Sequence, residues 1–218
     1  LIIVVEVAVL DILQGKLNSR FLVLSHRWET PSHPDPKATK KKLILAHLLA
    51  NPHIEGIWID FPCLPQGEHS GGRVKTEAER NFFSATLANV NYLYLGGKGL
   101  ALLDFTYLGR FWTSYEVVLL QRTIRGGRIV PCASDAEVDE RVTFIEYGAA
   151  AASGGAVTAA VKNTWGSKSI AEVVTELAKD DVTVTTNSDK EMLLPLLAKL
   201  DGVIFSMWPS SSSSSSSS

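Results

Sequence analysis

Short apolar runs of strand length alternate with stretches of helical periodicity along most of the chain. Their pattern predicts strands at residues 21–25, 54–60, 100–104, 128–132 and 182–186. It predicts helices at residues 37–50, 76–89, 107–123, 170–179 and 188–200. Strands that alternate with helices of this length indicate parallel pairing through right-handed crossovers, and near-continuous apolar strands indicate a sheet covered on both faces. The predicted fold is therefore an α/β doubly wound parallel sheet with helices on both faces.

Three of the predicted helices begin with a capping box, in which a hydroxyl residue and a carboxylate three positions later satisfy free backbone N–H groups. The pairs are Thr76 with Glu79, Ser169 with Glu172, and Ser188 with Glu191. Residues 40–42, three consecutive lysines, are interpreted as a solvated helix face.

Composition indicates a single domain with appendages. The 218 residues are 45% hydrophobic, which is enough to bury a core without disulfide bonds. We expect one α/β domain at residues 20–208 and a lead-in at residues 1–20, whose missing initial methionine indicates an incomplete N-terminus. The low-complexity residues 148–155 are expected to form a surface loop, and the serine-rich residues 209–218 a disordered tail.

Charge and cysteine content narrow the choice of partners and compartment. The formal net charge of -2 favours neither a nucleic acid nor an anionic membrane as partner. Cys63 and Cys132 lie far apart and outside any metal-type spacing, which is typical of a reduced, cytoplasmic protein. The apolar residues 1–10 form too short a run to span a bilayer. The five histidines match no metal-ligand spacing, so no metal is expected.

Polar clusters follow three of the predicted strands. The first strand runs into Ser25, Arg27 and Trp28. The second ends at Asp60, and the third ends at Asp104. Ligands bind beyond the carboxyl ends of the strands in open parallel sheets. Three consecutive polar strand ends therefore predict a ligand site at this edge of the sheet.

The helix after the third predicted strand carries an acid among apolar residues. Trp112 and Glu116 are four positions apart and so lie on one helix face, inside a broad apolar arc. Burying a carboxylate among apolar groups costs several kcal/mol unless the group is paired or lines a wet cleft. Glu116 is therefore a candidate functional acid. The alternative is a structural ion pair between Glu116 and Arg110 or Arg27.

The other candidates have structural interpretations that stay open. Arg27 is placed to hold a phosphate or carboxylate with two N–H groups, or is a solvated charge at the strand end. Asp60 is placed to accept hydrogen bonds from sugar hydroxyls, or caps the loop at residues 62–66. Trp112 taken alone is more typical of a core residue than of a ligand platform.

Three blocks at these clusters resemble a known family. FLVLSHRWE at residues 21–29, IWIDFPCLPQ at 57–66 and RFWTSYE at 110–116 resemble the signature blocks of heterokaryon-incompatibility (HET) domains. HET domains are in turn similar to Toll/interleukin-1 receptor (TIR) domains, whose parallel sheet is flavodoxin-like. The resemblance covers roughly residues 20–135 and implies a flavodoxin-like, TIR-like sheet.

The order of these features along the chain is also similar to that of TIR domains. One strand ends at residues 25–27, the next ends at Asp60, and a further strand ends before Pro131. A helix between the last two carries Trp112 and Glu116. Departures from the HET pattern, which place the chain in a divergent branch, are Glu29 for glycine, Pro65 for asparagine and Tyr115 for glutamine.

The resemblance also implies an activity. Some TIR enzymes cleave NAD at the nicotinamide–ribose bond with the glutamate of this helix, which implies Glu116 as the catalytic residue in a defence or self/non-self response. A tryptophan would then supply an aromatic wall, and Arg27 a cation near the diphosphate. NAD is the implied substrate, so no separate cofactor is expected. The implied substrate-binding residues are Ser25, Arg27, Trp28, Asp60 and Trp112.

Two other functions fit the same residues. A non-catalytic, TIR-like interaction module would signal by homotypic assembly through a sheet edge or the surface of the 61–75 loop, with Glu116 paired structurally. A nucleoside deoxyribosyltransferase-like enzyme would use a similar sheet and a carboxylate nucleophile. Cleavage of NAD, assembly without cleavage, and transfer of deoxyribose between free bases distinguish the three.

Overall fold

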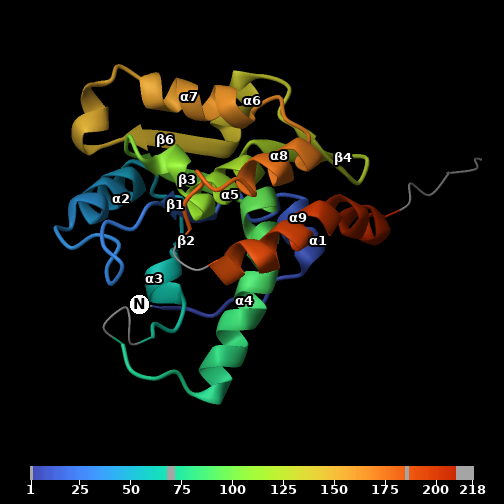
Figure 1. The fold of residues 1–218 in the computed structure, drawn as a ribbon, viewed down its shortest axis with the longest axis horizontal. Coiled ribbons are helices and arrows are strands. Elements are labelled where there is room, and N and C mark those ends of the chain that lie inside the picture. Colours follow the sequence, from blue (N-terminus) through green and yellow to red (C-terminus); the bar gives the residue numbers. More distant parts are fainter. Residues whose placement is uncertain (1, 68–71, 185–186, 210–218) are drawn as a thin grey trace, which may run out of the picture.

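A four-stranded parallel sheet in the order β2-β1-β3-β6 forms the centre of the computed structural model, which describes residues 2–67, 72–184 and 187–209. Its strands are β1 (Phe21–His26), β2 (Gly56–Trp58), β3 (Lys98–Leu103) and β6 (Val142–Glu146). The chain steps from β1 to β2 on one side and then back past β1 to β3 (Figure 1). That order is the one found in flavodoxin-like, doubly wound sheets, so the predicted α/β fold is confirmed.

Helices cover both faces of the sheet. The helices are α1 (Val9–Leu13), α2 (Thr39–Ala50), α3 (Asp60–Cys63), α4 (Glu77–Gly96), α5 (Phe111–Leu120), α6 (Asp135–Arg141), α7 (Ala156–Trp165), α8 (Ile170–Leu177) and α9 (Asn187–Met207), with 3₁₀ helices η2 (Tyr107–Gly109) and η3 (Gly148–Ala152). Because side chains alternate along a strand, Val23 and Leu103 join the core formed with α4 and α5. Leu24 and Leu102 join a smaller core on the other face, against Leu43 of α2.

Helix α5 occupies the centre of the larger core. It packs against β1 and β3 on one side and against α4 and α8 on the others. Every residue of α5 is buried except two, Trp112 and Glu116, which retain partial exposure. These two are four positions apart, so a single strip of one helix face remains open to solvent.

Two of the three predicted capping boxes are confirmed. Thr76 with Glu79 begins α4, and Ser169 with Glu172 begins α8. Ser188 lies inside α9, so the third predicted box is wrong. Within the described residues, no helix combines the length and the apolar character that crossing a bilayer requires.

The region after α5 differs from its prediction. The predicted helix at residues 107–123 ends at Leu120, and β4 (Arg122–Arg125) pairs antiparallel with β5 (Arg128–Pro131). Gly126 and Gly127 join these strands at φ +57° and +76°, which are the left-handed values that a two-residue type I′ hairpin turn requires. The predicted strand at 128–132 therefore belongs to a separate hairpin. The fourth strand of the parallel sheet is β6, which the sequence reading missed.

Three further expectations fall in the C-terminal third. Residues 148–155 were expected to form a surface loop, but η3 forms there with Ala150 buried, and the unpredicted helix α7 follows. Residues 182–184 form no strand; Thr183 makes an isolated bridge to Arg110, and residues 185–186 lie outside the described part of the chain. Most of the expected disordered tail, residues 210–218, also lies outside it.

Candidate functional site

The candidate site lies at the carboxyl ends of β1 and β3. These two strands are adjacent, with Ser25 beside Ala101 and His26 beside Leu102. The chain leaves β1 toward α2 on one face and leaves β3 toward α5 on the other, so the strand ends open into a topological switch point. Ligands of doubly wound sheets bind in the crevice at such a point, and the predicted polar strand ends do meet there.

Glu116 is held by hydroxyl groups. Ser25 Oγ donates to Glu116 Oε2 at 2.6 Å, and the Tyr107 hydroxyl lies 2.5 Å from the same Ser25 oxygen. The Tyr94 hydroxyl donates to the carbonyl oxygen of Leu24 at 2.8 Å and also lies close enough to lower the pKa of Glu116. The acid therefore sits against three uncharged hydroxyls at the base of the switch point.

Glu116 forms no ion pair within the described residues. Arg27 pairs with Asp104, and Arg110 donates to the Thr183 hydroxyl, so the alternative of a structural pair between Glu116 and either arginine is wrong. Burial raises the pKa of Glu116 to about 8. The hydrogen bond from Ser25 lowers this pKa by more than the negative charge of Asp60 raises it, and the Tyr94 hydroxyl lowers it slightly, so burial is the dominant cause. At neutral pH the carboxyl is therefore mainly protonated.

Asp104, at the end of β3, is paired with a cation, unlike Glu116. Its Oδ2 accepts from Arg27 Nε at 2.7 Å, and its Oδ1 accepts from the Thr106 backbone N–H and hydroxyl at 2.9 and 2.8 Å. Burial pushes the pKa of Asp104 up, but the hydrogen bonds from Arg27 and Thr106, together with the arginine charge, outweigh it and lower the pKa. Arg27 is thus not a free charge at the strand end: a carboxylate partner holds it, although its side chain stays 25% exposed.

Trp28 and Asp60 form a third contact at this edge. Trp28 Nε1 donates to Asp60 Oδ2 at 2.6 Å, and the Trp28 ring packs edge-on against Phe61 at 5.3 Å. His26 Nε2 lies 3.7 Å from Asp60 Oδ1, and neither His26 ring nitrogen has a hydrogen-bond partner among the described residues. Burial lowers the pKa of His26 more than Asp60 raises it, so this imidazole is neutral at pH 7.

Trp112 is directed elsewhere. Its indole N–H donates to Asp189 of α9 at 2.9 Å, and its ring packs edge-on against Phe111 and Tyr115. The hydrogen-bonding edge of Trp112 is therefore committed to holding α9 against α5. Of the two tryptophans considered from sequence, Trp28 donates its indole N–H to another predicted site residue, whereas Trp112 donates to Asp189.

Lys40 fixes the loop that carries Arg27 and Trp28. Its side chain is 2% exposed, and Nζ donates to the carbonyl oxygens of Arg27 and Pro34 at 2.5 and 2.6 Å. Nζ also lies 3.5 Å from Glu29 Oε1. Burial lowers the pKa of Lys40. The interpretation of residues 40–42 as a solvated face is wrong for Lys40, which belongs to the site's scaffold.

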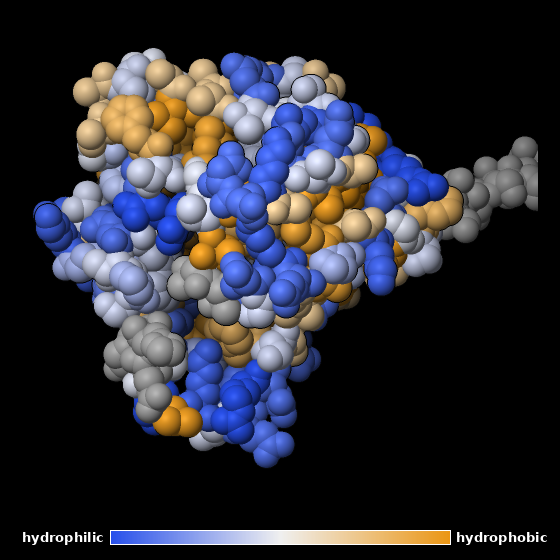
Figure 2. Space-filling model, in the orientation of Figure 1, coloured by the Kyte–Doolittle hydropathy of each residue, from blue (hydrophilic) through white to orange (hydrophobic). Residues whose placement is uncertain are grey.

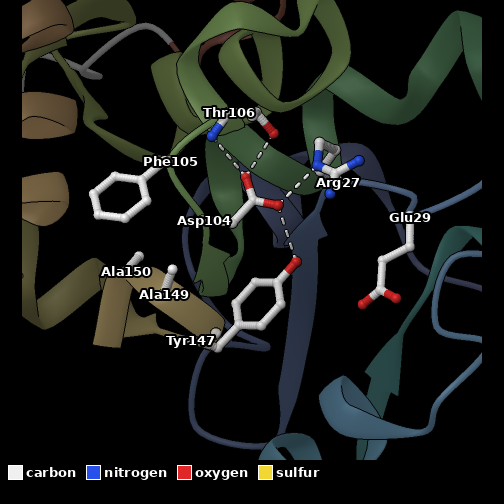
Figure 3. A pocket seen from close by; sticks show the side chains of 9 residues that line it. Arg27, Glu29, Asp104, Phe105, Thr106, Tyr147, Ala149 and Ala150 are labelled. Atoms are coloured by element: carbon white, nitrogen blue, oxygen red, sulfur yellow. Dashed lines mark hydrogen bonds and ion pairs between the residues drawn. The ribbon is translucent and has the colours of Figure 1, made fainter. Parts of the chain in front are cut away.

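A cavity of about 430 Å³ adjoins these residues (Figure 3). Arg27, Glu29, Asp104 and Phe105 line it, together with Tyr147 and the following residues 148–150. Glu116 does not line this cavity. The site therefore has two parts, a hydroxyl-lined acid and, beside it, a cavity across the ends of β3 and β6.

Among the described residues, no group of three His, Cys, Asp or Glu side chains is arranged to hold a metal ion. No family model matches the chain, and neither a curated protein nor a solved structure matches it.

Proposed function

We propose that this domain hydrolyses the nicotinamide–ribose bond of NAD-type dinucleotides, with Glu116 as the catalytic carboxyl group. The observation that supports this most is the setting of Glu116. The residue keeps partial exposure at the switch point, its side-chain hydrogen bonds come from hydroxyl groups, and no cation pairs with it within the part of the chain that the structure describes. A carboxyl without a counter-ion in a desolvated place is suited to receive positive charge from a ligand.

The chemistry requires such a group. Cleavage of the C1′–N bond leaves the electron pair on nicotinamide, which departs neutral, and leaves positive charge on the ribose as an oxocarbenium ion. A carboxylate beside C1′ stabilises that charge and then accepts a proton from the water that attacks C1′. The products are nicotinamide, ADP-ribose and one proton. No general acid is needed, because the leaving group of the substrate is already a cation.

The raised pKa of Glu116 fits this scheme through charge coupling. In the free protein its pKa is about 8. An opposite charge close to a carboxyl group favours the ionised form, so a bound pyridinium lowers the pKa and drives the proton off Glu116. The catalytic charge is then created where the substrate binds. Ser25 orients the carboxyl, and Trp28, held by Asp60, supplies the aromatic wall for nicotinamide.

The test is nicotinamide release by purified protein incubated with NAD. We expect the wild type to release nicotinamide and Glu116→Gln to do so at least about 10³-fold more slowly, because the amide cannot carry the charge that stabilises the ribose cation. Glu140→Gln, which removes an exposed carboxylate on α6, is the matched control and should leave the rate unchanged. Wild-type turnover in Glu116→Gln, or no release by the wild type at either low or high protein concentration, overturns the proposal.

A non-catalytic interaction module is the second candidate, and one feature of α4 favours it. The first half of this helix projects from the body of the domain (Figure 1), and none of residues 77–89 is buried. The projecting part is mainly hydrophilic (Figure 2), although Phe82 is 53% exposed there. The 61–75 loop expected to take part lies beside it, with residues 68–71 outside the described part. Concentration-dependent assembly that Phe82→Glu abolishes, without any NAD cleavage, would establish this function instead.

A further inference from the structure

The cavity beside Glu116 has a composition unlike that of the acid's own surroundings. Glu116 is surrounded by hydroxyls, whereas the cavity displays an exposed phenylalanine, a guanidinium group and a carboxylate. We infer that this cavity binds the second nucleoside of the dinucleotide, the adenosine half that takes no part in bond cleavage. The inference rests on the proposed function, because only a dinucleotide substrate has such a half.

The cavity and the acid are close enough to share one ligand. Arg27 follows the end of β1 and lies two residues beyond Ser25, so their Cα atoms are at most about 7 Å apart. Tyr107 links the two carboxyl-bearing residues: its hydroxyl lies 2.5 Å from Ser25 Oγ, which donates to Glu116, and its backbone N–H donates to the carbonyl oxygen of Asp104 at 3.2 Å. A ligand whose reacting ribose contacts Glu116 therefore extends past Arg27 into the cavity.

Phe105 provides a stacking surface. It follows Asp104 directly and is 63% exposed, although phenylalanine is usually buried. Its ring lies on the same side of the cavity as the methyl groups of Ala149 and Ala150, across from Arg27 and Glu29 (Figure 3). Apolar side chains also gather over the neighbouring segment from η3 to the start of α7 (Figure 2). A flat heteroaromatic base fits against such a wall, since bases stack on aromatic rings whatever their sequence identity.

The charges of the cavity suit a nucleoside better than a bare phosphate. Arg27 is balanced by Asp104, and Lys40 is balanced by Glu29. With no net positive charge, the cavity attracts a phosphate group alone only weakly, so contacts to the base and the ribose must supply most of the binding. Glu29 has a side chain that is 22% exposed, and its carboxylate can accept hydrogen bonds from ribose hydroxyls, as acidic residues do at nucleotide sites in related sheets.

Arg27 still has donors for the diphosphate that joins the two halves. Its Nε is bonded to Asp104, and its Nη1 donates to the carbonyl oxygen of Trp28 at 2.8 Å. Its Nη2 has no hydrogen-bond partner among the described residues. A guanidinium held by two bonds is fixed before the ligand arrives, so binding costs little ordering of this side chain.

The experiment compares two substrates, NAD and nicotinamide mononucleotide, which lacks the adenosine half. We expect Phe105→Ala to raise the KM for NAD about tenfold while leaving kcat unchanged, because the lost stacking affects binding alone. The same variant should leave kcat/KM for the mononucleotide unchanged. Phe105→Tyr, which keeps a stacking ring, should restore the KM for NAD. Phe82→Ala, at an exposed phenylalanine on α4, is the matched control and should change neither substrate's kinetics.

Two results would overturn the inference while leaving the proposed function intact. One is a KM for NAD that Phe105→Ala does not change. The other is an equal fall in kcat/KM for both substrates, which would mean that Phe105 has a structural role. If the wild type releases no nicotinamide, the proposed function fails, and titration with ADP-ribose then tests the cavity directly. Saturable binding that Phe105→Ala weakens about tenfold supports the inference, and absence of ADP-ribose binding overturns it.

Discussion

Glu116 and Asp104 both lie close to Tyr107, and their carboxyl groups have opposite pKa shifts. Asp104 accepts hydrogen bonds from Arg27 and Thr106, and its pKa is lowered. Glu116 accepts from the Ser25 hydroxyl, has no cationic partner among the described residues, and has a pKa raised to about 8. Two differences account for this: Glu116 is the more deeply buried of the two, and among the described residues only Asp104 has a guanidinium partner.

The difference between the two carboxyl groups indicates which one shapes the binding surface and which one takes part in the reaction. A carboxylate with a permanent cation keeps its charge at all ordinary pH values and can only help to shape the site, as Asp104 does by fixing Arg27. A carboxyl group without a cation stays neutral until a ligand brings positive charge. Glu116 is therefore the group whose charge responds to a substrate, and the Arg27–Asp104 pair is part of the surface that the substrate contacts.

The largest expected effect concerns stability and pH. In the unfolded chain Glu116 has an ordinary pKa near 4.5, whereas in the fold its pKa is about 8. Between these values the unfolded state has lost a proton that the folded state retains. The free energy of unfolding therefore falls as pH rises, by up to about 1.4 kcal/mol per pH unit, and this fall ends near pH 8. Gln does not titrate, so Glu116→Gln should become progressively more stable than the wild type from pH 5 to pH 8.

Urea unfolding at each pH unit from 5 to 8 measures this effect. Glu140→Gln serves as the control, because it removes an exposed carboxylate and its difference from the wild type should stay flat. A flat difference for Glu116→Gln as well would mean that the carboxyl is already ionised in the folded protein at pH 5. The contrast between the two acids would then disappear.

The second prediction is a loss of stability, whereas Glu116→Gln is expected to gain stability relative to the wild type. Asp104→Asn leaves the Arg27 guanidinium, whose side chain is 25% exposed, without its carboxylate. We expect the variant to lose about 1–3 kcal/mol of stability at pH 7, between the values typical of exposed and of fully buried pairs. Because the pKa of Asp104 is lowered, this contribution is present above about pH 4 and is lost as pH falls through the folded pKa. The wild-type advantage should therefore be smaller at about pH 3 than at pH 7.

Asp139→Asn is the matched control for urea unfolding at both pH values. Asp139 pairs with Lys162 at 2.7 Å, but its side chain is 57% exposed. Pairs of that kind contribute about 0–1 kcal/mol. If Asp104→Asn unfolds at the same urea concentration as the wild type, Asp104 does not hold Arg27 in place.

The strand ends that meet in the site were predictable because each is marked locally. An apolar run that stops at Ser25 or at Asp104 shows where a strand ends without any knowledge of its neighbours. The position of Glu116 followed from helical periodicity, and α5 does leave only Glu116 and Trp112 partly exposed. The hairpin also had a local signal, since Gly126-Gly127 between two short runs is typical of a type I′ turn.

The partners of Glu116 had no such signal. Tyr94 reaches it from α4, and that approach depends on how α4 packs against α5, which no short pattern encodes. Lys40 is one of three consecutive lysines, and nothing in that run distinguishes it from Lys41 and Lys42, which are exposed. Strand β6 follows α6 directly, with Arg141 ending the helix and no loop residues to mark the boundary.

The smallest expected effect tests how the hydroxyls control Glu116. The Ser25 hydroxyl donates to the carboxyl and so favours its charged form, which lowers the pKa. If the carboxylate is the active form, kcat/KM for NAD rises with pH through the pKa of the free protein, about 8. Ser25→Ala should move that midpoint upward by about one pH unit, since a hydrogen bond to a charged group contributes about 1.5–3 kcal/mol, part of which water replaces.

A pH–rate profile from pH 6 to 10 measures the midpoint and the plateau separately. Ser114→Ala is the control, because this buried serine lies on the same helix but donates to the carbonyl oxygen of Leu108, and its midpoint should not move. A lowered plateau with an unmoved midpoint in Ser25→Ala would mean that the hydroxyl positions the carboxyl without stabilising its charge. An upward midpoint with an intact plateau would mean that Ser25 sets how much of the protein is ionised, and that the ionised acid works equally well without it.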